Sequence, residues 1–201
     1  MALLKVPLDT TRFATGMTWK DYLAQMGDTR ARTEDNYQHA SLTEDERRFF
    51  SGLRQVRHAL MLAENWCGDV HRNSPMLARI VEAMPNCDLR VFFRDQHLDL
   101  TDLYLNNGYR SIPVIVFFDQ DWNEIGRWIE RPHAATQRSF AIRAKTTDIA
   151  PQDKQEAALQ EFRSQVQAAY QTSAPEKSLW RDTAKEVRTI LELRLGLAPK
   201  S

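Results

Sequence analysis

Residues 56 to 69 read VRHALMLAENWCGD and join a short apolar run to a turn that carries Cys67. The run from Val56 to Ala63 is too brief for a long helix and has the length of a buried strand. Beyond the turn, apolar residues recur at helical spacing from Met76 to Met84, and a proline-asparagine pair ends this pattern. We therefore expect a strand, a turn that exposes a cysteine, and a helix.

The pattern continues with shorter elements of the same kinds. Leu89 to Phe93 and Val114 to Phe118 are rich in branched and aromatic residues and predict two further strands. Leu100 to Leu105 predicts a short helix between them, and Glu124 to Ile129 follows a polar turn as a hairpin partner. The expected order is strand, helix, strand, helix, strand, strand, which is typical of an α/β fold.

Helical signals flank this core on both sides. Residues 17–54 include an acidic turn that Ser41 or Thr43 can cap. The last part of the chain shows amphipathic helices from Gln155 to Tyr170 and from about Leu179 to Leu195. We therefore expect one compact unit in three parts: an N-terminal helical extension (1–54), a core (55–145) and a C-terminal helical extension (146–201).

The charge balance argues against two classes of partner. The chain has 27 basic and 27 acidic side chains and a formal net charge of zero, so no overall field attracts it to nucleic acid or to an anionic membrane surface. Its first residues lack a basic flank followed by a long apolar run, and no segment approaches the about 18 apolar residues of a membrane span. We predict a cytoplasmic protein without nucleic-acid or membrane partners.

The two cysteines are too few for a disulfide framework or a cysteine-built metal site. No set of Cys, His or acidic residues repeats a ligand spacing, so we predict no metal and no resident cofactor. Cys87 precedes the second strand whereas Cys67 follows the first, which puts them at opposite edges of a parallel pair, ~17–20 Å apart. Since a disulfide needs Cα atoms within about 7 Å, we interpret Cys87 as structural.

Four features in register resemble thioredoxin, whose motif is W-C-G-P-C. Trp66-Cys67-Gly68 occupies the first strand-to-helix turn, and Pro75 stands where thioredoxins have a helix-kinking proline. Ser111-Ile112-Pro113 precedes a strand where thioredoxins place a cis-proline, and the Asp119 to Ile129 hairpin follows as in that fold. The resemblance implies a thioredoxin-like fold with a central mixed sheet flanked by helices.

The chain is more similar still to a group of bacterial thioredoxin-like proteins that have W-C-G-D at the motif and helical extensions on both sides. These proteins share a Y-L-x-N-G-x-R-S-I-P stretch, here Tyr104 to Pro113, and a G-x-W-x-x-R-P hairpin end, here Gly126 to Pro132. The resemblance covers about residues 15 to 195 and bears on fold more than on function.

Three positions depart from thioredoxin. The second cysteine of the motif falls on Val70, the motif proline on Asp69, and the buried aspartate of thioredoxin on Met61. The resolving thiol and the usual proton acceptor are therefore both missing. A mixed disulfide at Cys67 would have to be released by an external thiol such as glutathione, acting as co-substrate.

The reactivity of Cys67 depends on two opposing effects. Unpaired N–H groups at a helix N-terminus favour the thiolate by ~0.3 to 2 kcal/mol. A carboxylate at Asp69, roughly 6 Å away, opposes it by ~3 kcal/mol at an effective dielectric of about 20, and less if water reaches the pair. The sequence alone leaves the sign of the pKa shift open.

Other residues of the motif regions are expected to line a groove beside Cys67. Arg110 can pair with Asp69 or hold a substrate carboxylate, although a solvated surface arginine is an equal alternative. His71 is near enough to act as a base, but solvation on a surface helix is the more frequent role of such a histidine. The expected substrate-binding residues are Trp66, Gly68, Asp69, Arg110, Ile112 and Pro113.

Two hypotheses of different classes follow. In the first, the protein is a thioredoxin-like oxidoreductase that exchanges thiols and disulfides through Cys67 alone, with a thiol or disulfide substrate. In the second, it is a non-catalytic module whose groove binds a protein or a small ligand. The retained Trp66-Cys67-Gly68 and Pro113 favour the first, and the losses at Met61 and Val70 favour the second.

Overall fold

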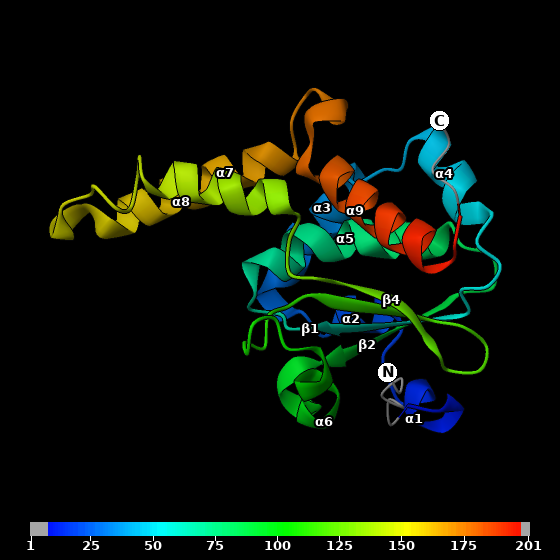
Figure 1. Cartoon of the computed structure of the whole chain (residues 1–201). Coiled ribbons are helices and arrows are strands. Elements are labelled where there is room, and N and C mark those ends of the chain that lie inside the picture. The colour runs from blue at the N-terminus through cyan, green and yellow to red at the C-terminus, as the bar shows by residue number, and fades with distance from the viewer. Residues whose placement is uncertain (1–7, 198–201) are drawn as a thin grey trace.

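A computed structural model describes residues 8–197 of the chain. Four strands form one sheet in the order β2-β1-β3-β4 (Figure 1). β1 runs parallel to β2 and antiparallel to β3, and β4 pairs antiparallel with β3. The sheet is therefore mixed, as expected. The strands are β1 (His58–Ala63), β2 (Asp88–Phe93), β3 (Val114–Phe118) and β4 (Glu124–Ile129).

The two central strands are apolar because both of their faces are covered. Every residue of β3 is buried, and so is every residue of β1 after His58. Such strands show continuous apolar runs in place of alternation. In register, Met61 of β1 lies between Val91 of β2 and Ile115 of β3, which places it at the centre of the sheet.

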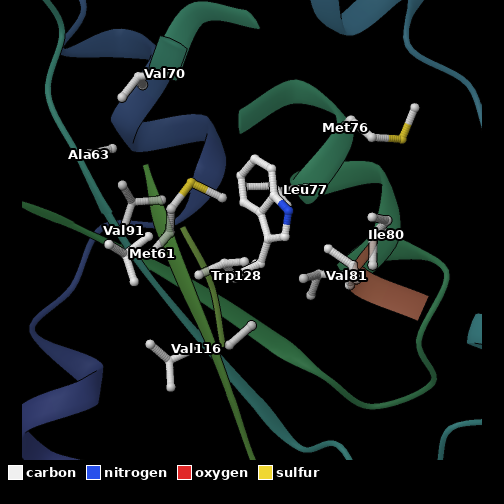
Figure 2. Close-up of a cluster of buried hydrophobic side chains, with 14 of the residues drawn as sticks. Met61, Ala63, Val70, Met76, Leu77, Ile80, Val81, Val91, Val116 and Trp128 are labelled. Carbon is white, nitrogen blue, oxygen red and sulfur yellow. The ribbon is translucent and has the colours of Figure 1, made fainter. Parts of the chain in front are cut away.

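One face of the sheet is covered by α5 (Gly68–Glu82) and α9 (Leu179–Arg194), while α1 (Thr10–Ala14) and α6 (Leu98–Thr101) lie on the other side (Figure 1). Side chains from the sheet and α5 form an apolar cluster that includes Met61 and Val70 (Figure 2). α9 approaches β4 so closely that a Cβ on Gly126 would lie 2.7 Å from a methyl carbon of Ile190.

The N-terminal extension contributes α2 (Trp19–Ala24), α3 (Arg30–His39) and α4 (Glu44–Ser51). Thr43 caps α4, as one of the two expected alternatives, and Glu46 completes a capping box with it. The Glu46 carboxylate also forms a nearly buried ion pair with Arg181 of α9. The N-terminal and C-terminal extensions therefore contact each other through α4 and α9.

The remaining helices are α7 (His133–Arg143) and α8 (Gln155–Tyr170), which pack against each other and project from the sheet as a pair (Figure 1). Of the expected C-terminal helices, α8 and α9 are confirmed, and α9 packs on the chain's own sheet. Short 3-10 helices complete the described structure at Gly27–Thr29, Arg94–Gln96, Asp102–Tyr104, Gln152–Lys154 and Pro175–Lys177.

Candidate functional site

Cys67 lies between the end of β1 and the first turn of α5, where it is the N-cap residue. Its side chain is half-buried, and its thiol donates a long hydrogen bond to the carbonyl oxygen of Ile112, with Sγ 3.7 Å from that oxygen. The Ile112–Pro113 peptide bond is cis. The chain thus brings its motif cysteine against the backbone segment before Pro113, which the sequence placed near it.

The two positions that lost thioredoxin's polar groups are fully buried. Val70 is inaccessible to solvent on the first turn of α5, and Met61 is inaccessible on β1. Figure 2 shows both side chains within the same apolar cluster. The second cysteine, Cys87, comes just before β2, and both cysteines are free thiols. Neither of these two positions therefore offers a thiol or a carboxylate to Cys67.

Burial, more than the neighbouring charge, controls the acidity of Cys67. Removal of the sulfur from water raises the pKa of the Cys67 thiol above its ordinary value, and the charge of Asp69 raises it further. The backbone N–H groups of Val70 and Asp69 and the charge of Arg72 lower this pKa without cancelling the effect of burial. The helix N-terminus thus stabilises the thiolate too little to make Cys67 an acidic thiol.

Asp69 belongs to an ion-pair cluster at the edge of the site. Its carboxylate contacts Arg72 and Arg131, with each N–O distance at 3.3 Å. Arg131 also pairs with the adjacent Glu130. Of the alternatives for Arg110, pairing with Asp69 is wrong: Arg110 makes a bidentate pair with Asp102, at 2.7 and 3.0 Å, on the exposed surface.

Of this cluster the sequence indicated only Asp69, and Arg72, Glu130 and Arg131 were not foreseen; Arg131 is the partner most distant along the chain. It comes from the Gly126 to Pro132 motif, which had been used only as a mark of the fold. Its neighbour Glu130 has a left-handed backbone (φ 72°), which is uncommon for a residue other than glycine, and its N–H donates to the Pro113 carbonyl at 2.7 Å. The arginine before Pro132 was the available signal.

Trp66 and Arg94 form the other side of the site. The Trp66 ring is 57% exposed, and the Arg94 guanidinium lies over it, 4.8 Å from the ring centre. Arg94 also donates to the carbonyl oxygen of Arg110 at 3.0 Å. Arg94 therefore connects Trp66 to the segment that precedes Pro113. An arginine in the loop after the second strand gave no sequence signal for this role.

His71 is buried, so its expected solvation on the helix surface is wrong. Its Nδ1 lies 2.9 Å from the Thr33 hydroxyl, the Asn65 backbone interacts with its ring, and Asn36 donates to its carbonyl. Burial, together with nearby arginines, lowers its pKa to about 4. Because His71 is buried and bonded to Thr33 of the N-terminal extension, it holds the start of α5 in place and does not face the site as a base.

The C-terminal extension forms hydrogen bonds with the beginning of α5. Asn73, one turn beyond the ion-pair cluster, donates to the Tyr170 hydroxyl at 3.2 Å and accepts from Thr183 at 3.1 Å. The Trp180 indole donates to the carbonyl oxygen of Arg72 at 2.6 Å. Helices α8 and α9 thus fix the first two turns of α5, on which Cys67 and Asp69 depend.

Residues 8–197 contain no group of three or more His, Cys, Asp or Glu side chains placed to hold a metal ion. No helix within these residues is long and apolar enough to cross a membrane.

A half-buried cysteine at a helix N-terminus, facing a cis-proline at the edge of a mixed sheet, defines a thioredoxin-fold protein. The model of a thioredoxin family matches residues 16–146, and the chain belongs to this family. None of the curated proteins compared with the chain matches it.

Two solved structures share the fold. A protein of unknown function from Pseudomonas aeruginosa, PA1234, is 17% identical with a TM-score of 0.62, over 95% of this chain and 99% of that one. An HIV epitope-scaffold protein is also 17% identical, with a TM-score of 0.60 over 92% of this chain and 96% of its own. At this identity the likeness concerns the fold alone.

Proposed function

We propose that this protein is a single-cysteine member of its thioredoxin family that exchanges thiols and disulfides through Cys67. The observation that carries the proposal is the 3.7 Å contact between the Cys67 sulfur and the Ile112 carbonyl oxygen. An incoming disulfide beside Pro113 would thereby meet the thiol and an extended backbone segment together. Trp66 and Arg94 offer an aromatic and a cationic surface at the same place.

The reaction requires two exchange steps. The Cys67 thiolate attacks one sulfur of a mixed disulfide between a substrate and glutathione, forms a disulfide with the glutathionyl sulfur and releases the substrate thiolate. A second glutathione thiolate then attacks that glutathionyl sulfur, which releases Cys67 as a thiolate and yields oxidised glutathione. One glutathione thiol enters, and its sulfur joins the glutathionyl sulfur taken from the substrate, so one disulfide is exchanged for another and no resident cofactor is needed. We place this activity in the cytoplasm, where glutathione is reduced.

One observation favours the second hypothesis, a non-catalytic binding module. Burial raises the pKa of Cys67, so little thiolate is present at neutral pH. Val70 and Met61 replace the resolving thiol and the buried carboxylate that thioredoxins have at these positions. In this hypothesis the groove beside Pro113 and Trp66 binds a peptide or small ligand, and Cys67 takes no part in chemistry.

Turnover of a glutathionylated peptide by added glutathione tests the first hypothesis. We expect the protein to accelerate release of glutathione from the peptide, and Cys67→Ser to abolish this acceleration. Cys87→Ser is the matched control, because Cys87 precedes β2 and should not contribute. An acceleration that survives in Cys67→Ser contradicts the proposed role of the thiol.

A further inference from the structure

Helices α7 and α8 with their connecting turn, residues 133–170, form an arm that projects from the body of the protein (Figure 1). In α7 the buried residues are Ala135 and Ile142. In α8 they all lie in the part that returns to the body, namely Val166, Ala169 and Tyr170. The distal half of the arm therefore packs only on itself and leaves apolar side chains in contact with water.

The distal half of the arm carries both an apolar projection and an apolar hollow. Phe140 on α7 is 69% exposed, and Ile149 in the connecting turn is 71% exposed. Between the end of α7 and the start of α8 lies a cavity of about 300 Å³, whose apolar wall is made by Leu159 and Phe162. Arg143 and polar side chains form its rim. A cavity of this size is suited to one aromatic side chain.

The Phe140 side chain lies beside the rim of the hollow, to which α7 contributes Arg143. Phe140 and Arg143 are three residues apart on α7, and residues at that spacing are neighbours on a helix surface. A twofold axis beside this face would place the Phe140 side chain of each copy in the hollow of the other. Such an arrangement is self-complementary and closed, as twofold dimers require.

The charges on the two helices complement each other in this arrangement. The charged residues of α7 are basic, Arg138 and Arg143, of which Arg143 also pairs with Asp148. In α8, Glu156 and Glu161 outnumber the single basic residue, Arg163. Packing α7 of one copy against α8 of the other brings opposite charges together. Packing α7 against α7 would bring like charges together, so the charges favour one pairing over the alternative.

We propose that the arm is a dimerisation surface and that its occupant is the arm of a second copy of this chain. Four helices then pack around two Phe140 side chains, which the single chain leaves exposed. The inference does not depend on the activity of Cys67, because Phe140 and the hollow lie in the distal half of the arm and the arm's link to the site is at its returning end, at Tyr170.

Sedimentation velocity over a range of protein concentrations tests this dimer. We expect the wild type to shift from monomer to dimer as concentration rises, and Phe140→Asp to raise the dissociation constant by about 100-fold or more, because a twofold interface contains the substituted contact twice. Leu193→Asp is the matched control: Leu193 is 76% exposed on α9, away from the arm. It should leave the dissociation constant unchanged, and both variants should keep the wild-type circular dichroism spectrum.

A charge exchange tests the pairing of α7 with α8. Arg138→Glu and Glu161→Arg should each weaken the dimer, while an equimolar mixture of the two variants should restore it. A wild type that stays monomeric at every concentration would overturn the proposal. So would a dimer that survives Phe140→Asp, or one that Leu193→Asp disrupts equally.

Discussion

Removal of the Asp69 charge should make Cys67 a more reactive thiol. Asp69→Asn keeps the shape of the side chain but removes a negative charge that raises the pKa of the Cys67 thiol. It also leaves Arg72 without its carboxylate partner, so that this guanidinium can favour the thiolate more strongly. Both effects lower the pKa of Cys67, so the proportion of thiolate at neutral pH should increase.

The expected change in the pKa of Cys67 depends on the distance between the Asp69 carboxylate and the sulfur, and on how strongly this charge is screened. A carboxylate roughly 6 Å from the sulfur contributes ~3 kcal/mol at an effective dielectric of about 20. Asp69 is partly screened by its two arginine partners, and we expect about half of this energy to remain. Since 1.4 kcal/mol corresponds to a factor of about 10, the alkylation rate at neutral pH should rise by about tenfold.

The assay is the rate of iodoacetamide alkylation as a function of pH, measured in a Cys87→Ser background. Below the pKa of Cys67 the rate rises with pH as thiolate forms, so the Asp69→Asn profile should lie at lower pH than that of the parent. Asp102→Asn is the control, because its carboxylate pairs with the exposed Arg110. An unchanged or slower rate in Asp69→Asn would refute the electrostatic argument.

Four further predictions concern stability, measured by urea or thermal unfolding. Tyr22→Phe removes a buried hydroxyl that has no hydrogen-bond partner in residues 8–197, and should stabilise by about 0.5–1 kcal/mol. Tyr170→Phe removes a hydroxyl that is hydrogen-bonded and should destabilise by about 1 kcal/mol; equal effects of the two would contradict the difference in bonding. Arg181→Met leaves Glu46 buried without its ion-pair partner and should cost about 3–5 kcal/mol, lowering the melting temperature by about 6–20 °C; a fall of under about 3 °C would contradict this. Gly126→Ala forces a methyl group against α9 and should cost about 1–3 kcal/mol, whereas an unchanged melting temperature would show that the helix moves freely.

The sequence predicted those elements whose buried side chains are apolar. The bounds of β3, β4 and α8 agree with the structure, because branched and aromatic runs or a helical apolar period mark them. α3 was not singled out within the helical N-terminal part. Its buried side chains are Thr33 and Asn36, and polar residues produce no apolar period even when they face the interior.

The site was predictable where it depends on local sequence and not where it depends on the path of the chain. The contact of Cys67 with the Pro113 segment followed from the resemblance. The distant ion-pair partner of Asp69 did not, since Arg131 follows β4 along the chain and Arg110 pairs with Asp102 instead. The direction of the pKa shift of Cys67 could not be predicted from the sequence either, because burial has the largest effect on this pKa and depends on how the chain packs.

Formation and release of a glutathione adduct at Cys67 tests the proposed function most directly. The Cys87→Ser variant is incubated with oxidised glutathione, its mass is recorded, and reduced glutathione is then added. The proposal predicts one glutathionyl group on Cys67, formed faster at higher pH because burial raises the pKa of this thiol, and removed by reduced glutathione. Absence of the adduct, or an adduct that reduced glutathione leaves in place, would contradict thiol-disulfide exchange and favour the binding module.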